Sequence, residues 1–125
     1  MTSVDLSRLS VAQLLDRFVK LCLQDEEAAN SAWVSECDRL VVQISDVKKE
    51  LQKRPGNQHG ALVALFTHPN LQVRYHAAAN LMSIMPVEAR LQMEAIADSK
   101  VYPIAGHAGT YLIMQELAAS ERRSK

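Results

Sequence analysis

The stretch HPNLQVRYHAAANLMSIM, residues 68–85, decides the fold of this chain. Its apolar side chains recur at the spacing of a helix that buries one face. His68 and Pro69 form a turn, and Asn70 stands where its side chain can cap the first amides of a helix. The sequence therefore predicts a helix that begins after Asn70. Four residues form its inner face: Val73, Ala77, Leu81 and Ile84.

A nearly uncharged segment surrounds this helix. From Pro55 to Val87 the only formally charged residue is Arg74. Within it, GALVALFT (residues 60–67) is apolar and long enough for only about two turns of helix. A short apolar helix, a proline turn and a helix rich in alanine indicate two antiparallel helices that pack closely. We expect them to form the central layer of the domain.

Two longer helices are predicted ahead of this segment. Ser10 and Gln13 have the spacing of a capping box, which places the first helix start at Val11. The second helix is predicted to begin at the acidic residues 25–27 and to end at basic residues 53–54. Acidic side chains favour a helix start and basic side chains favour a helix end, and the residues 55–57, Pro-Gly-Asn, stop the helix.

A strict apolar seam runs along the second helix with the spacing 4-3-4-3-4. Its members are Trp33, Cys37, Leu40, Ile44, Val47 and Leu51. Such a seam is compatible with a coiled-coil dimer, but sustained coiled coils usually have more heptads. We therefore expect the seam to pack inside the domain and the protein to be a monomer rather than a homodimer.

The last third of the chain repeats the pattern of a turn followed by a helix. Pro86 is suited to the first turn of a helix. This helix carries one apolar stripe of Val87, Leu91 and Ala95 and, beside it, a second of Ala89, Met93 and Ile96. A turn around Pro103 then precedes a last helix. No segment alternates apolar and polar residues as a strand would. The sequence predicts an all-α domain of about six helices.

The segment VRYHAAANL, residues 73–81, resembles the second half of a HEAT repeat. The matching residues are Pro69, Val73, Arg74, Ala77, Ala78 and Leu81. The second copy, YPIAGHAGTYL (102–112), matches by shape but lacks the Val-Arg pair. With LLDRFVKLCLQ (14–24) ahead of this unit, most of the chain is similar to a small bacterial family of HEAT-like proteins of unknown function.

This resemblance implies a HEAT-like or armadillo-like stack of antiparallel helical hairpins, and it implies no chemistry. We expect one domain over residues 1–125. Its expected parts are a lead-in at 1–9, two helices at 10–54, two HEAT-like hairpins at 57–119 and a flexible tail at 120–125.

Composition argues against several classes of protein. Fourteen basic and fourteen acidic residues leave no formal net charge, whereas binding to nucleic acid usually requires a basic excess. No apolar run approaches the roughly 18 residues of a membrane span, and the start of the chain does not read as a secretory signal. We expect no nucleic-acid or membrane partner and a cytoplasmic location. The two cysteines, Cys22 and Cys37, are predicted to be buried reduced thiols.

No set of residues for catalysis or for a metal is visible. The four histidines stand at positions 59, 68, 76 and 107, without metal-ligand spacing, and no glycine-rich phosphate loop is present. Arginine is protonated at any working pH and cannot act as a general base. We therefore predict no enzyme, no metal and no cofactor, and we assign Arg74 as structural or partner-binding.

The favoured hypothesis is a non-catalytic, protein-binding helical-repeat module. Arg74, Tyr75 and His76 are residue types common in binding hot spots, and helical geometry places them off the inner stripe, with His76 partly exposed. One concrete form is an immunity protein that neutralises a cognate bacterial toxin. Two alternatives stay open at this point: a self-associating structural domain that uses the seam, and a small enzyme whose site is not visible in the sequence.

Overall fold

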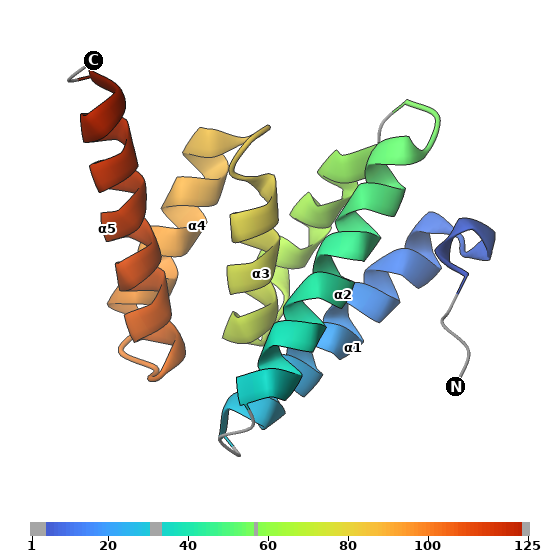
Figure 1. Ribbon diagram of the computed structural model, residues 1–125, viewed down its shortest axis with the longest axis horizontal. Helices are drawn as coiled ribbons and strands as arrows, with labels where there is room; N and C mark the ends of the chain where they lie inside the picture. Colours follow the sequence, from blue (N-terminus) through green and yellow to red (C-terminus); the bar gives the residue numbers. More distant parts are fainter. Residues whose placement is uncertain (1–4, 31–33, 57, 124–125) are drawn as a thin grey trace. The chain divides into compact units, whose positions relative to one another are not determined.

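The computed structural model describes residues 5–30, 34–56 and 58–123, and within these ranges it contains helices and no strand (Figure 1). The prediction of an all-α fold is confirmed. The elements in chain order are η1 (Leu6–Arg8), α1 (Val11–Asn30), α2 (Val34–Lys53), η2 (Gln58–Thr67), α3 (Leu71–Leu81), α4 (Pro86–Asp98) and α5 (Ile104–Arg123). The η elements are 3-10 helices. The chain divides into two compact units, with unit 1 ending at Leu65 and unit 2 beginning at Phe66.

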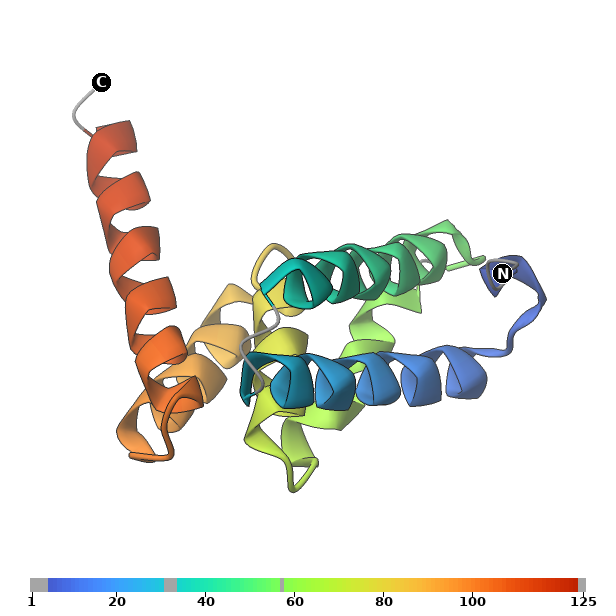
Figure 2. The same cartoon turned by 60° about the horizontal axis from the view of Figure 1, so that its bottom comes forward.

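In unit 1, α1 and α2 form an antiparallel hairpin and lie side by side (Figures 1 and 2). Their facing side chains are almost fully buried. From α1 these are Leu14, Phe18, Leu21 and Cys22, and from α2 they are Leu40, Ile44, Val47 and Leu51. The four seam residues on α2 therefore pack inside the unit, as predicted. Trp33 and the side chain of Cys37 lie outside the described residues.

The boundary between the two long helices differs from the prediction. Residues 25–27 lie in the last third of α1, not at the start of α2. Asp25 is only 7% exposed, because it continues the buried stripe of α1 from Phe18 and Cys22 toward Ala28. Packing along this stripe outweighs the preference of acidic residues for a helix start.

Both ends of the hairpin carry the local signals that the sequence shows. The Ser10 amide donates to Gln13 Oε1 (2.8 Å), and the Gln13 amide donates to Ser10 Oγ (3.1 Å), which completes the predicted capping box. After α2, Gly56 adopts a φ of 78°, a left-handed conformation that a side chain would strain. The stop at Pro55 and Gly56 is therefore confirmed.

Arg54 ties the segment around η1 to the end of α2. Its Nη2 donates to the carbonyl oxygens of Leu6 (3.0 Å) and Leu9 (2.6 Å), and its Nε donates to Glu50 Oε2 (2.9 Å). The ion pair is largely shielded, with 20% of the Arg54 side chain and 12% of the Glu50 side chain exposed. The structure thus gives Arg54 a specific anchoring role beyond that of a basic residue at a helix end.

Unit 2 contains α3, α4 and α5. Asn70 caps α3 as predicted, because its Oδ1 accepts from the amides of Gln72 (2.8 Å) and Val73 (3.2 Å). The predicted inner residues Val73, Ala77 and Leu81 are fully buried. The prediction for Ile84 is wrong. The helix ends at Leu81, so the turn that follows leaves Ile84 45% exposed.

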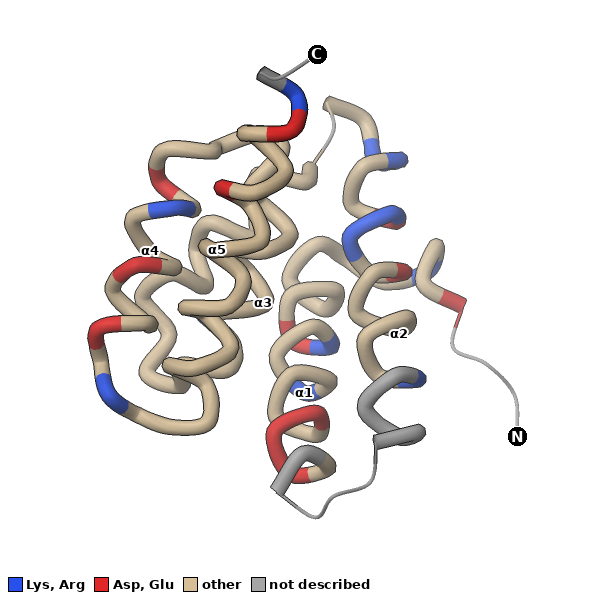
Figure 3. The backbone as a smooth tube through the Cα atoms, turned by 60° about the vertical axis from the view of Figure 1, so that its left-hand side comes forward, with Lys and Arg blue, Asp and Glu red and all other residues tan. Residues whose placement is uncertain are grey.

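The two remaining helices also leave apolar side chains outside. In α4, Ala89, Met93 and Ile96 are buried, whereas Val87 and Leu91 are exposed. α5 continues to Arg123, so residues 120–123 are helical where a tail was expected. Its first part, residues 104–115, carries no Lys, Arg, Asp or Glu, and the tube of α5 is tan over this length (Figure 3). Among the helices of the described ranges, none has the length and apolar character that a membrane span requires.

Candidate binding groove between α3 and α5

A groove of about 370 Å³ opens within unit 2, between α3 and α5. One residue of α3 and five residues of α5 line it. They are Tyr75, His107, Thr110, Tyr111, Met114 and Gln115. Two tyrosine rings and a thioether supply apolar surface, and the imidazole, hydroxyl and carboxamide groups supply donors and acceptors. This mixture is typical of a surface that binds another molecule.

Aromatic contacts hold the wall of the groove. The rings of Tyr75 and Tyr111 meet edge to face with centroids 6.2 Å apart, and Tyr75 meets His76 in the same way at 5.4 Å. Such pairs add about 0.5–1.5 kcal/mol to the area that they bury. Burial raises the pKa of Tyr111, so its hydroxyl keeps its proton at neutral pH. The wall is therefore a fixed, uncharged aromatic surface.

Of the three residues predicted to bind a partner, the structure places only Tyr75 in this groove. Arg74 is half-buried, and its Nε donates to the carbonyl oxygen of His68, which ties the start of α3 to the preceding turn. His68 itself accepts from the Asn70 amide through Nδ1 (3.0 Å). Arg74 thus has a structural role, because its side chain binds a backbone carbonyl oxygen just before the start of α3.

The predicted partial exposure of His76 is wrong. Only 7% of the residue is exposed, and its Nε2 lies 3.3 Å from Nε2 of Gln72, which is also buried. Its carbonyl oxygen accepts from Asn80 Nδ2 (2.7 Å). The buried ring of His76 contacts the ring of Tyr75 and so supports it.

Sequence reasoning missed the α5 side of the groove. Helical spacing does bring Tyr111, Met114 and Gln115 near His107 on one side of α5. The signal in the sequence is that α5 carries apolar or uncharged residues on more than one face. In the structure, Ile113, Met114 and Leu117 are each more than half exposed. A second hollow of about 450 Å³ beside Leu112, Ile113 and Leu117 extends this surface along α5.

Two titratable groups that could support other chemistry, Cys22 and His59, belong to unit 1 and are not among the residues that line this groove. Cys22 is fully buried in unit 1, and burial together with the nearby Asp25 raises its pKa far above the ordinary value. His59 is also buried there, with Nδ1 3.3 Å from Gln52 Nε2. In the part of the chain that the structure describes, no group of three His, Cys, Asp or Glu side chains is placed to hold a metal.

The fold and the groove define a small all-helical protein with a helix-lined, largely uncharged surface groove. Residues 12–116 match DUF2019, a domain of unknown function, and the chain belongs to this family. The crystal structure of the protein RPA1889 from Rhodopseudomonas palustris CGA009 is similar, with 36% sequence identity and a TM-score of 0.83. The similarity covers 91% of this chain and 94% of that chain. No curated protein matches the chain.

Proposed function

We propose that this protein is a non-catalytic binding module whose α3–α5 groove holds a short apolar segment of a protein partner. The observation that carries the proposal is the Tyr75–Tyr111 wall beside the exposed Met114. Tyrosine offers large area with few rotatable bonds, and methionine adapts to the shape of a bound side chain. His107 and Gln115 at the rim can bond to the backbone of the segment.

The apolar character of the expected segment follows from the charge of the groove. None of its six lining residues is an acid, a lysine or an arginine. A charged side chain placed there would lose water without gaining a counter-ion, which is unfavourable. A leucine, methionine or phenylalanine would instead bury area against Tyr111 and Met114 at about 25 cal/mol per Å².

The finer predictions belong to the same proposal. A HEAT-like character of the hairpin around α3 is supported by the Asn70 cap and by the bond from Arg74 to the His68 carbonyl, which fixes the turn before the helix. Buried Ala77 and Ala78 permit close helix packing. A cytoplasmic location, a monomeric state and a cognate bacterial toxin as the partner stay predictions.

The proposal is tested by site-specific crosslinking of the full chain in cells. A photo-reactive benzophenone side chain at Met114 should form one dominant covalent adduct with a protein partner. The same side chain at Asp98, an exposed position on α4, should not form it. Mass spectrometry identifies the partner, which is then purified for affinity measurements. The absence of an adduct at Met114, or equal adducts at both positions, would overturn the proposal.

Affinity for the purified partner provides the second half of the test. Met114→Ala should weaken binding by about 2 kcal/mol, roughly thirtyfold, if Met114 is a hot spot. Val87→Ala is the matched control, because Val87 is also apolar and exposed but lies on α4. Tyr75→Ala should weaken binding too, with some loss of stability through its ring contacts. Equal affinities of the Met114 and Val87 variants would contradict the groove assignment.

A further inference from the structure

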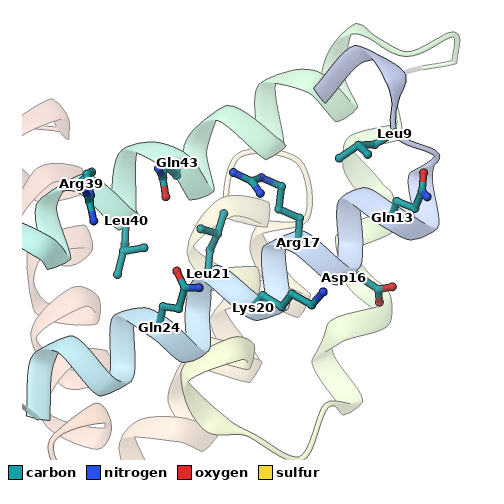
Figure 4. Close-up of a pocket in the computed structure, with 10 residues that line it drawn as sticks. All are labelled: Leu9, Gln13, Asp16, Arg17, Lys20, Leu21, Gln24, Arg39, Leu40 and Gln43. Atoms are coloured by element: carbon teal, nitrogen blue, oxygen red, sulfur yellow. The ribbon is translucent and has the colours of Figure 1, made fainter. Parts of the chain in front are cut away.

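A second groove, unrelated to the proposed partner groove, lies in unit 1 between α1 and α2. Its volume is about 660 Å³. Figure 4 shows the side chain of Arg17 extending from α1 toward α2, and Arg39 and Leu40 extending from α2 toward α1. Leu21 and Leu40, both buried, form an apolar floor. The described lining of the groove is mostly polar and includes three cations.

The charge of this groove is unbalanced. Among the described lining residues on α1, Arg17 and Lys20 stand with a single acid, Asp16, whereas the whole chain has no formal net charge. Within the described residues neither Arg17 nor Lys20 forms an ion pair. Arg17 is also half-buried. A guanidinium that has lost part of its water without gaining a carboxylate is a favourable site for an anion.

The lining favours a peptide carboxylate over other anions. The guanidinium of Arg17 can bind a carboxylate or a phosphate through two parallel hydrogen bonds. The carboxamides of Gln24 and Gln43 can donate to and accept from a peptide backbone. No aromatic side chain among the described lining residues could stack on a nucleobase.

We propose that the α1–α2 groove binds an acidic segment of a protein, with a Glu or Asp carboxylate on Arg17 and the backbone of the segment on Gln24 and Gln43. Lys20 and Arg39 attract the segment and accelerate its association. This site is separate from the α3–α5 groove in residues and in chemistry, so failure of one proposal leaves the other intact.

The test measures fluorescence anisotropy of a labelled peptide with alternating glutamate and leucine, titrated with the full-length protein at low salt. The same peptide with glutamine in place of glutamate is the comparison. The glutamate peptide should bind at least about tenfold more tightly, and added salt should weaken it. Equal binding of the two peptides, or no binding of the glutamate peptide at about 1 mM protein, would overturn the proposal.

Variants assign the binding to the groove. Arg17→Gln should weaken the glutamate peptide by about tenfold or more, whereas Lys49→Gln, which removes the same charge from an exposed position of α2 outside the groove, should leave it nearly unchanged. Equal losses in both variants would show a mere effect of net charge. If Arg17→Gln unfolds the protein, Lys20→Gln is tested in its place, because Lys20 is exposed. This variant should also weaken binding of the glutamate peptide by about tenfold.

Two further probes separate a carboxylate site from other anion sites. Inorganic phosphate should displace the glutamate peptide only weakly, because it has no backbone for Gln24 and Gln43 to bond. A single-stranded oligonucleotide of equal charge should bind no more tightly than the peptide. An oligonucleotide that binds more tightly and loses its affinity in Arg17→Gln would overturn the peptide assignment and identify a polyanion site.

Discussion

The thiol of Cys22 lies inside unit 1, on the stripe of α1 that packs against α2. Two effects keep it protonated. Burial disfavours the charged thiolate, and the carboxylate of Asp25 disfavours it further, so the pKa of Cys22 lies far above the ordinary 9.0. Because only the thiolate is strongly nucleophilic, we infer that Cys22 contributes packing to the fold and no reactivity.

A Cys37→Ser variant, in which Cys22 is the one remaining thiol, should react very slowly with a thiol reagent at pH 8. In urea the same chain should react at the rate of a free thiol. The unfolding free energy should also fall as the pH rises above about 9.0, because the unfolded chain then releases a thiol proton that the folded chain retains. Absorbance of the released reagent gives the rates. Equally fast labelling with and without urea would contradict the prediction.

Single-residue environments were only partly predictable from the sequence. Apolar periodicity correctly places Val73, Ala77 and Leu81 inside, because each side chain is driven inward by its own burial. His76 is an exception, because it is buried although it lies off the apolar stripe. Six of the eleven residues of α3 are buried, so its covered face is wider than its apolar stripe and includes a histidine and Gln72. The width of a covered face depends on neighbouring elements that no local pattern encodes.

The helix α2 separates a buried face from an exposed face clearly. Leu40 and Ile44 are 2% exposed and pack toward α1, whereas the adjacent Val41 and Val42 are about half exposed on the other side. Four apolar residues thus stand within one and a half turns and have opposite environments. The exposed residues Val41 and Val42 therefore serve as controls for measuring how much the buried seam contributes to the unfolding free energy.

Leu40→Ala should lower the unfolding free energy by about 2–5 kcal/mol, since it leaves a cavity in the core of unit 1. Val41→Ala should change it by less than about 0.5 kcal/mol, because that side chain is already half in water. Urea denaturation of both variants, followed by circular dichroism, measures the difference. Similar effects of the two substitutions would mean that the seam is not the core.

Helix starts were predicted better than the division between α1 and α2. The capping box at Ser10 and the Asn cap at residue 70 are local hydrogen-bond signals, whereas Pro86 acts through its fixed φ in a first turn, and all three mark real helix starts. The acidic residues 25–27 carry no such signal, only a charge preference worth less than about 1 kcal/mol. Burial of the α1 stripe through Leu21, Cys22 and Ala28 together exceeds it.

For the molecule as a whole, the described seam residues Leu40, Ile44, Val47 and Leu51 are buried in unit 1 and are not exposed for self-association. Apolar side chains remain exposed on α5, at Ile113, Met114 and Leu117. Three such side chains form a patch much smaller than the interface of a stable dimer, which buries about 800 Å² per partner. The expected state of the free protein is therefore a monomer.

Sedimentation at micromolar concentration and pH 8 should report a mass near 13.9 kDa that does not change with concentration. The pH is set above the pI of about 6.9, so that a net charge suppresses non-specific association. Leu117→Glu serves as the comparison and should behave identically. A mass that rises with concentration in the wild-type chain, and not in Leu117→Glu, would show that α5 pairs with a second copy.

The groove itself is a property of the whole fold that the sequence showed only in fragments. Tyr75 was identified because it stands off the inner stripe of its own helix. The other groove residues His107, Tyr111 and Met114 belong to α5, which is separated from α3 along the chain by α4. Bringing them together requires the crossing of α3 and α5, which depends on the packing of α4 and not on any spacing along the chain.

The two bonds from Arg54 to carbonyl oxygens just ahead of α1 also constrain how α1 and α2 align. A seam with a seven-residue repeat looks nearly the same after a slide of one heptad, so apolar packing alone permits more than one register. The carbonyls of Leu6 and Leu9 stand 48 and 45 residues before Arg54 in the chain. A slide of even one turn, about 5.4 Å, would carry the guanidinium out of reach of both. Arg54 therefore favours a single alignment of two helices whose apolar faces accept several.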